Sequence, residues 1–147
     1  MRASIVVLTY NQLKEGTVPC LDSIVRYTPE GEYELVLVDN ASSDGTPEHL
    51  RSFAEGRNNV KLVLNQENKG YAGGNNDGLH AASGDSIILL NNDTMVTPGW
   101  LDELLAPLER DRSIGLICPI TNSAGNEQTV LLPSLNEENY VEVAGRY

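Results

Sequence analysis

The sequence predicts an α/β domain in which a mostly parallel β-sheet carries helices on both faces. Strand-like and helix-like segments alternate along the chain, which is typical of βαβ crossovers. The strand-like segments are continuous runs of β-branched and aliphatic residues, as expected for strands that are buried on both faces of a parallel sheet. The length of 147 residues suits a single domain with its own core, so we expect residues 1–147 to form one domain.

Five apolar runs are the expected strands, and they cover residues 4–8, 34–38, 60–64, 86–90 and 114–118. The third run is expected to lie nearer an edge of the sheet. The fourth run, Ile87 to Leu90 with Ser86 before it, is the most apolar, and we expect it to be the most buried.

The helices are predicted from apolar residues at helical spacing. The first follows the first strand and places Val18, Leu21, Ile24 and Val25 on one face. Thr46-Pro47 and Thr97-Pro98 look like helix starts, with threonine as the N-cap and proline at the first helical position. A glycine- and asparagine-rich loop from Asn65 to Gly78 is expected to lead into a short helix through Leu79 and Ala82.

After Pro119 the alternating pattern becomes weaker. Residues 128–132 are a candidate strand, and residues 136–147 begin like a helix close to the end of the sequence. We therefore expect a chain that is cut within a larger domain, with a short natural terminus as the alternative.

Composition excludes several classes of protein. The net charge of −11 argues against binding of nucleic acid, because phosphate contacts need clustered Lys and Arg. No stretch approaches the ~20 apolar residues needed to cross a bilayer, and residues 1–7 resemble a strand more than a signal peptide, so a cytoplasmic location is expected. Cys20 and Cys118 have apolar neighbours and are interpreted as small buried residues, with a disulfide or a reactive thiol as the alternatives.

Three of the expected strands end in polar clusters, and the carboxyl ends of parallel strands share one rim of a sheet, where ligands bind. These clusters are Thr9-Tyr10-Asn11, residues 39–45 and Asn91-Asn92-Asp93-Thr94. Asp39 could accept hydrogen bonds from a ribose hydroxyl or a base N–H, or it could cap its own turn. Asp44 precedes Gly45 and is interpreted as a turn residue.

A glycine-rich segment, residues 68–78, has the spacing of neither a dinucleotide fingerprint nor a P-loop. It could still bring N–H donors to a phosphate, or it could be a flexible loop. Lys69 could meet a phosphate, although a solvated surface lysine is the favoured interpretation. Asp93 could ligate Mg²⁺ or Mn²⁺ together with a diphosphate, or cap the turn before Thr97. His49 and His80 are interpreted as structural residues.

Taken in order, these motifs resemble those of family 2 glycosyltransferases with the GT-A fold. The resemblance runs from residue 4 to about 127, and it rests on residues 4–11, 38–46, 68–78 and 89–94. It is closest to the rhamnosyltransferase-like and O-antigen-type members, where Asn-Asn-Asp often stands at the position of the metal motif.

The resemblance implies a single nucleotide-sugar-binding domain that transfers a sugar from a nucleoside diphosphate-sugar donor to an acceptor hydroxyl with inversion. It implies that the donor contacts Thr9, Tyr10, Asn11, Asp39, Asn40, Asn68, Gly70, Asn76 and Asn92, and that Asp93 holds a divalent cation, Mg²⁺ or Mn²⁺. The acceptor would be a glycan or a lipid-linked sugar that binds a region absent from this chain. A role in polysaccharide biosynthesis, peripheral to the inner face of a membrane, would follow.

The sequence departs from the family pattern in two places. The first position of the metal motif is Asn91 instead of Asp, which lowers the expected affinity for the metal ion and leaves Asp93 to supply most of it. The acidic motif that contains the family's catalytic base has no match after Asp93. Glu127 is an acidic residue in range, but its context differs and we interpret it as a surface residue, so the catalytic base stays unassigned.

The leading hypothesis is therefore the donor-binding half of a glycosyltransferase that is inactive alone. A non-catalytic module that binds a nucleotide-sugar is the alternative, and a nucleotidyltransferase is a weaker one, because the segment after the first strand lacks a basic glycine-rich signature. Apolar surface left uncovered by a missing region would favour self-association.

Overall fold

The computed structural model describes residues 2–121, 129–130, 135–136 and 138–146. The described residues fall into two compact units, one that ends at Val96 and one that begins at Thr97. The first unit contains the sheet and the polar clusters. Within the described residues, no helix is long and apolar enough to cross a membrane.

The sheet of the first unit has four parallel strands in the order β3-β2-β1-β4. The strands are β1 (Ala3–Thr9), β2 (Tyr33–Asp39), β3 (Val60–Leu64) and β4 (Ser86–Asn91). In the register of β1, Thr9 pairs with Asp39 and Leu8 pairs with Asn91, so the carboxyl ends of the three strands lie side by side. The parallel sheet and the edge position of the third strand are as the sequence predicts.

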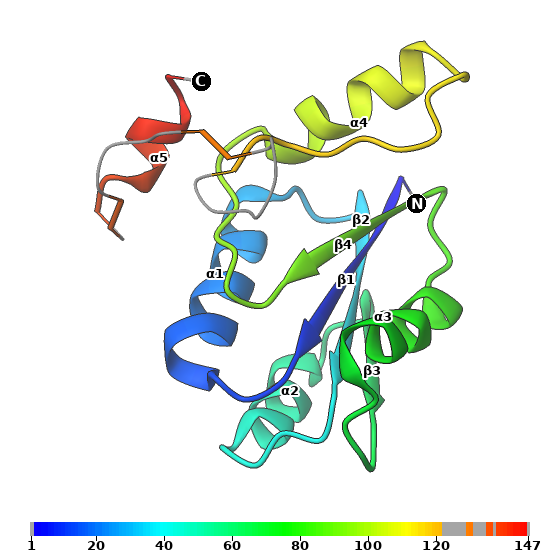
Figure 1. Ribbon diagram of the computed structural model, residues 1–147, viewed down its shortest axis with the longest axis vertical. Helices are drawn as coiled ribbons and strands as arrows, with labels where there is room; N and C mark the ends of the chain where they lie inside the picture. The colour runs from blue at the N-terminus through cyan, green and yellow to red at the C-terminus, as the bar shows by residue number, and fades with distance from the viewer. Residues whose placement is uncertain (1, 122–128, 131–134, 137, 147) are drawn as a thin grey trace. The chain divides into compact units, whose positions relative to one another are not determined.

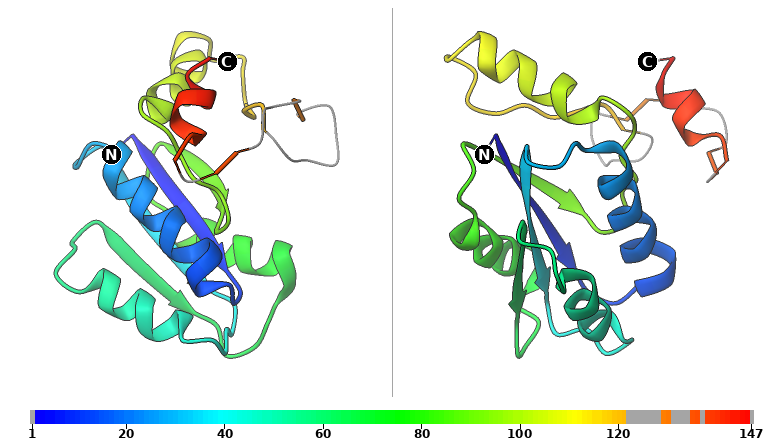
Figure 2. Two further views of the ribbon diagram at one scale, coloured as in Figure 1. Left: turned by 90° about the vertical axis from the view of Figure 1, so that its left-hand side faces the viewer. Right: turned by 180° about the vertical axis from the view of Figure 1, so that it is seen from behind.

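Helices cover both faces of this sheet (Figures 1 and 2). Helix α1 (Val18–Tyr27), which continues the π-helical turn η1 (Leu13–Thr17), and α2 (Thr46–Ala54) lie on one face, and α3 (Gly70–Ala81) lies on the other. The two central strands alternate their side chains between these helices. A buried cluster of Val6, Val36 and Val38 faces α3.

Helix α3 corrects one prediction. It begins at Gly70, so most of the segment expected to be a loop is helical. Gly74 and Gly78 explain this: a Cβ atom would lie 2.4 Å from Leu8 Cδ1 at the first position and 2.3 Å from Val6 Cγ1 at the second. These glycines let the helix approach the sheet more closely than a helix with side chains there could. Close packing on the sheet therefore outweighs the low helix propensity of glycine.

Strand β4 corrects a second prediction, because it is not the most buried strand. Ile87 and Leu89 are 46% and 47% exposed, whereas β2 is buried throughout. Both side chains point to the face that carries α3, since they pair in register with Ser4 and Val6. Helix α3 lies over β1, β2 and β3 instead, which leaves these two apolar side chains of β4 partly exposed.

The second unit contains α4 (Trp100–Arg110) and α5 (Tyr140–Ala144). The strand predicted at residues 114–118 is wrong: within the described part of the chain this segment pairs with no strand, and Leu116 is 83% exposed. An apolar run forms a strand only when it finds a partner to satisfy its backbone. Cys118 is exposed as well, so the expectation that both cysteines are buried holds only for Cys20. The candidate strand at 128–132 falls largely outside the described residues, as does Glu127.

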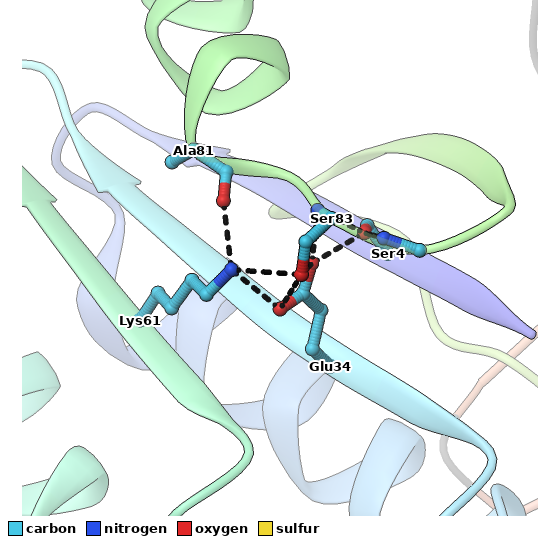
Figure 3. Close-up of polar contacts among 6 residues, drawn as sticks. Ser4, Glu34, Lys61, Ala81 and Ser83 are labelled. Carbon is cyan, nitrogen blue, oxygen red and sulfur yellow. Dashed lines mark hydrogen bonds and ion pairs between the residues drawn. The ribbon is translucent and has the colours of Figure 1, made fainter. Parts of the chain in front are cut away.

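An ion pair between a buried carboxylate, Glu34, and a partly exposed lysine, Lys61, joins the strands at the end opposite the polar clusters (Figure 3). Glu34 is 1% exposed and accepts hydrogen bonds from the Ser4 hydroxyl at 2.6 Å and from the N–H and hydroxyl of Ser83. Lys61 Nζ lies 2.7 Å from Glu34 Oε2 and also donates to the carbonyl of Ala81. Burial alone would raise the pKa of Glu34, but Lys61, Ser4 and Ser83 together lower it to about 2. This carboxylate ties β1, β2, β3 and the end of α3 together.

Candidate functional site

A groove of about 340 Å³ opens at the carboxyl ends of β1, β2 and β4. Its lining comes from all three strand ends and from the start of α3, and consists of Leu8, Tyr10, Gln12, Asn40, Asn68, Gly70, Tyr71, Asn91, Asn92 and Asp93. This is the rim at which ligands bind in open parallel sheets. Most of these side chains are amides or aromatic rings, which suits a polar ligand with a planar group.

The loop after β1 forms one wall and has an unusual backbone. Asn11 and Gln12 both have a φ of 59°, in the left-handed region that non-glycine residues rarely adopt. Two hydrogen bonds to the loop after β2 hold this backbone in place. The N–H of Asn11 donates to Ser42 Oγ at 2.8 Å, and Asn11 Oδ1 accepts from the N–H of Ser43 at 2.9 Å. Asn11 itself is thus a link between two loops and does not line the groove.

Asp44 adds a second link between the same two loops. Its carboxylate accepts hydrogen bonds from the hydroxyl and N–H of Thr46, at the start of α2, and from the N–H of Leu13. The Thr46 hydroxyl is the main reason that the pKa of Asp44 lies below its usual value. The interpretation of Asp44 as a turn residue is therefore confirmed.

Thr9 and Asp39 are buried and directly adjoin the lining residues Tyr10 and Asn40 in the chain. Thr9 is fully buried, and its hydroxyl donates to the carbonyl of Val38 at 3.1 Å and reaches Asp39 Oδ1 at 3.3 Å. Asp39 is 2% exposed, and its other oxygen accepts from the N–H of Ser42. In this structure Asp39 makes the turn-capping bond that was the alternative to a ligand contact.

Asn40 connects the floor of the groove to α3. Its Nδ2 donates to Asn68 Oδ1 at 2.8 Å and to the carbonyl of Gly70 at 3.1 Å. Its Oδ1 accepts from Asn65 Nδ2 and from the N–H of Lys69. With the residue 2% exposed, these four bonds fix the turn from which α3 starts.

Two further residues of the glycine-rich segment, Lys69 and Asn76, are not among the residues that line the groove. Lys69 Nζ lies 2.8 Å from Asp77 Oδ2, and this ion pair lowers the pKa of Asp77. The interpretation of Lys69 as a surface lysine thus agrees with its place outside the groove lining. Asn76, which was expected to contact the donor, is exposed on α3 and does not line the groove either.

The loop after β4 supplies the acidic part of the site. Asn92 Nδ2 donates to Thr17 Oγ1 at 3.0 Å and to the carbonyl of Asn11 at 3.3 Å. Asp93 and Asn91 are exposed. Among the described residues that line the groove, Asp93 alone carries a charge.

These oxygen donors fit a hard divalent cation that also binds a ligand. Mg²⁺ is commonly held by one or two carboxylates together with substrate phosphates, and the Asp93 carboxylate with neighbouring amide oxygens matches that arrangement. A closed protein cage is not present, because the described residues contain no group of three His, Cys, Asp or Glu side chains placed to hold an ion.

Of the residues expected to form the site, the structure brings six to the groove: Tyr10, Asn40, Asn68, Gly70, Asn92 and Asp93. Thr9, Asn11 and Asp39 directly adjoin its lining residues in the chain, and Asn76 is exposed on α3. Sequence reasoning gave no individual role to Leu8, Gln12 or Tyr71. Tyr71 could have been found by treating the glycine-rich segment as the first turn of a helix at the rim.

Comparison with known proteins gives a family match and similar solved structures. The family model described as glycosyl transferase family 2 matches residues 4–141. Glycosyltransferase AglE of Haloferax volcanii is 31% identical over 100 residues, which cover 67% of this chain and 33% of that protein.

Two solved structures are similar as well. S. aureus TarS 1-349 in complex with UDP has a TM-score of 0.66 and 27% identity, over 75% of this chain and 32% of that chain. The mannosyltransferase PcManGT from Pyrobaculum calidifontis, in complex with GDP-Man and Mn²⁺, has a TM-score of 0.58 and 33% identity, over 64% of this chain and 28% of that chain. They confirm the predicted GT-A fold. The chain spans about a third of the length of these relatives, or less.

Proposed function

Since this chain belongs to glycosyl transferase family 2, we propose that its groove binds the nucleoside diphosphate-sugar donor of a sugar transfer reaction. The observation that carries the proposal is the convergence of three strand ends on one groove, with Asp93 at its β4 side. Relatives with the same fold bind UDP, UDP-GlcNAc or GDP-Man, which supports a ligand of this class.

We propose that the diphosphate lies at Asp93 with a divalent cation between them. The acidic chain, with a net charge of −11, offers the groove no lysine or arginine among its described lining residues, so another positive charge is needed near a diphosphate. A bound Mg²⁺ or Mn²⁺ would neutralise the charge of the leaving diphosphate. The Mn²⁺ in the mannosyltransferase structure supports this choice of ion.

We divide the other predicted site residues into a group that contacts the donor and a group that does not line the groove. Tyr10, Asn40, Asn68, Gly70 and Asn92 would contact the donor from the groove wall. Thr9, Asn11 and Asp39 would act by shaping the loops, and the predicted contacts of Asp39 with the base or ribose and of Asn76 with the donor stay predictions.

For the reaction itself we propose direct displacement with inversion at the anomeric carbon, as the sequence motifs indicate. A carboxylate would take the proton of the acceptor hydroxyl while the nucleoside diphosphate leaves. Asn-Asn-Asp at residues 91–93 supports a place in the rhamnosyltransferase-like and O-antigen-type subgroup, with a glycan or lipid-linked acceptor.

A chain that holds only the donor site would bind the donor and transfer no sugar. One observation favours a second candidate, a module that binds the donor without catalysis. Asp93 is the one carboxylate among the described residues that line the groove, so no second carboxylate there is placed to act as a base. An assay of sugar transfer and donor hydrolysis by the full-length gene product separates the two. Turnover supports the transferase, and tight donor binding without turnover supports the module.

Donor binding is tested by calorimetric titration of the folded chain with UDP, dTDP and GDP, each with Mn²⁺. We expect saturable binding of at least one of them and its loss in EDTA. Asp93→Asn should weaken binding about 10- to 150-fold, because an interaction of a charged group contributes about 1.5–3 kcal/mol. Asp85→Asn, at the opposite end of β4, is the matched control. Absence of binding heat with all three nucleotides would contradict the proposal.

We also propose that the chain self-associates through β4. Its outer edge has no partner strand in the described part of the chain, and Ile87 and Leu89 add half-exposed apolar surface beside that edge. Size-exclusion chromatography over a wide concentration range tests this. A single monomer peak at all concentrations would refute it.

A further inference from the structure

We propose that Tyr71 stacks its ring on the nucleobase of the donor. The inference rests on the proposed function and deepens it, because it assigns one end of the groove to the base and names a side chain that binds it. The glycine-rich motif at residues 68–78 contains this tyrosine, but the predicted site residues do not include it.

The groove has a direction that follows from the strand order. Its charged residue, Asp93, follows β4 at one edge of the sheet, whereas Asn40 follows β2, two strands away. Neighbouring strands lie about 4.8 Å apart, so these two ends of the groove are separated by roughly 10 Å. A nucleoside diphosphate is an elongated ligand, and with its phosphates at Asp93 its base would lie toward Asn40 and the start of α3.

Tyr71 stands at that second end. It occupies the first turn of α3, lines the groove, and its side chain is among the most exposed large apolar groups of the chain, at 63% exposure. An aromatic ring left in water on the wall of a groove is a ready surface for a planar ligand.

The backbone beneath this ring is firmly held. The carbonyl of Tyr71 accepts a hydrogen bond from Asn75 Nδ2 at 2.9 Å, and Asn75 is 5% exposed. The preceding carbonyl, of Gly70, accepts from the buried Asn40 amide. The ring is therefore attached to a fixed backbone. When a base stacks on it, the only conformational entropy lost by the protein at this point is that of the Tyr71 side chain.

Replacing an aromatic ring by alanine removes the stacking of one base and lowers the affinity about 5- to 150-fold. Every base has a π-face, so this contact would strengthen binding of any base, and hydrogen bonds from the amide groups would select among them.

The test compares Tyr71→Ala and Tyr71→Phe with the unchanged chain. Titrations use the best-bound of UDP, dTDP and GDP, and, as a probe that lacks a base, inorganic pyrophosphate, all with the same divalent ion. Tyr27→Ala, at the end of α1 and outside the groove, is the matched aromatic control. Circular dichroism checks that each variant is folded.

We expect Tyr71→Ala to weaken nucleotide binding at least fivefold and to leave pyrophosphate binding unchanged, while Tyr71→Phe binds like the unchanged chain. Unchanged nucleotide affinity in Tyr71→Ala would overturn the inference and leave the proposed function intact. An equal loss for nucleotide and pyrophosphate would also overturn it, because the ring would then act on the whole groove. If the unchanged chain binds no nucleotide, the proposed function itself fails, and the inference fails with it.

Discussion

Replacing Glu34 by glutamine should remove much of the pH dependence of stability in the first unit. The pKa of Glu34 is about 2 in the folded chain, against an ordinary value of 4.5. Because the folded pKa is depressed, the ionised carboxylate stabilises the fold above pH 4.5, and this contribution is lost as the pH falls toward 2.

The size of the effect follows from the shift in pKa. A difference of about 2.5 units corresponds to about 3 kcal/mol at neutral pH, of which about 2 kcal/mol should be lost by pH 3. Burial supports a contribution of this order, since the Glu34 side chain is 2% exposed, although its partner Lys61 is 44% exposed and water weakens the pair on that side. Glutamine keeps the shape of the side chain and removes its charge.

The assay is urea denaturation followed by far-UV circular dichroism, at pH 6.5 and at pH 3. We expect Glu34→Gln to lower the free energy of unfolding by about 3 kcal/mol at pH 6.5 and by about 1 kcal/mol at pH 3. Glu32→Gln is the control: Glu32 pairs with Arg2 at 2.8 Å but is partly exposed, so its effect should stay within about 1 kcal/mol. An equal loss for Glu34→Gln at both pH values would refute the reasoning, since the charge would then not be the stabilising feature.

Three further outcomes are expected. Gly78→Ala should lower the free energy of unfolding by about 1–2 kcal/mol in urea denaturation, because the new Cβ would lie 2.3 Å from Val6 Cγ1, whereas Gly115→Ala, with no atom within 4 Å, should be neutral; equal effects of the two would contradict this. Asn40→Ala should cost about 1–3 kcal/mol by the same assay and weaken nucleotide binding, since four hydrogen bonds are lost; unchanged affinity would show that the groove forms without it. A thiol reagent such as DTNB should label Cys118 in the folded chain and Cys20 only after unfolding, because burial, with the nearby Asp93 charge, raises the pKa of Cys20 to about 12; rapid labelling of both would argue against this.

The strands whose burial the sequence patterns predicted well are those that have partners on both sides. β1 and β2 lie in the middle of the sheet, and their β-branched runs are buried as expected. The same pattern misled at Ile87 and Leu89 and at residues 114–118. Hydrophobicity shows that a segment favours burial, but whether a partner covers it depends on contacts far away in sequence.

The candidate site was predictable to the extent that parallel strands bring their carboxyl ends together. Asn40 and Asp93 were identified because they follow strands directly. Tyr71 was missed because glycine-rich sequence has low helix propensity, and the close contact of Gly74 and Gly78 with Leu8 and Val6 that favours the helix appears only in three dimensions.

The hydrogen bonds between the rim loops have a consequence for engineering. Asn11 joins Ser42 and Ser43, Asp44 joins Leu13, and Asn92 joins Asn11, so each loop takes its shape from residues in another. A loop transplanted alone from a relative would arrive without the side chains that hold its backbone in place. Chimeras designed to alter donor preference should therefore exchange the three loops as one set.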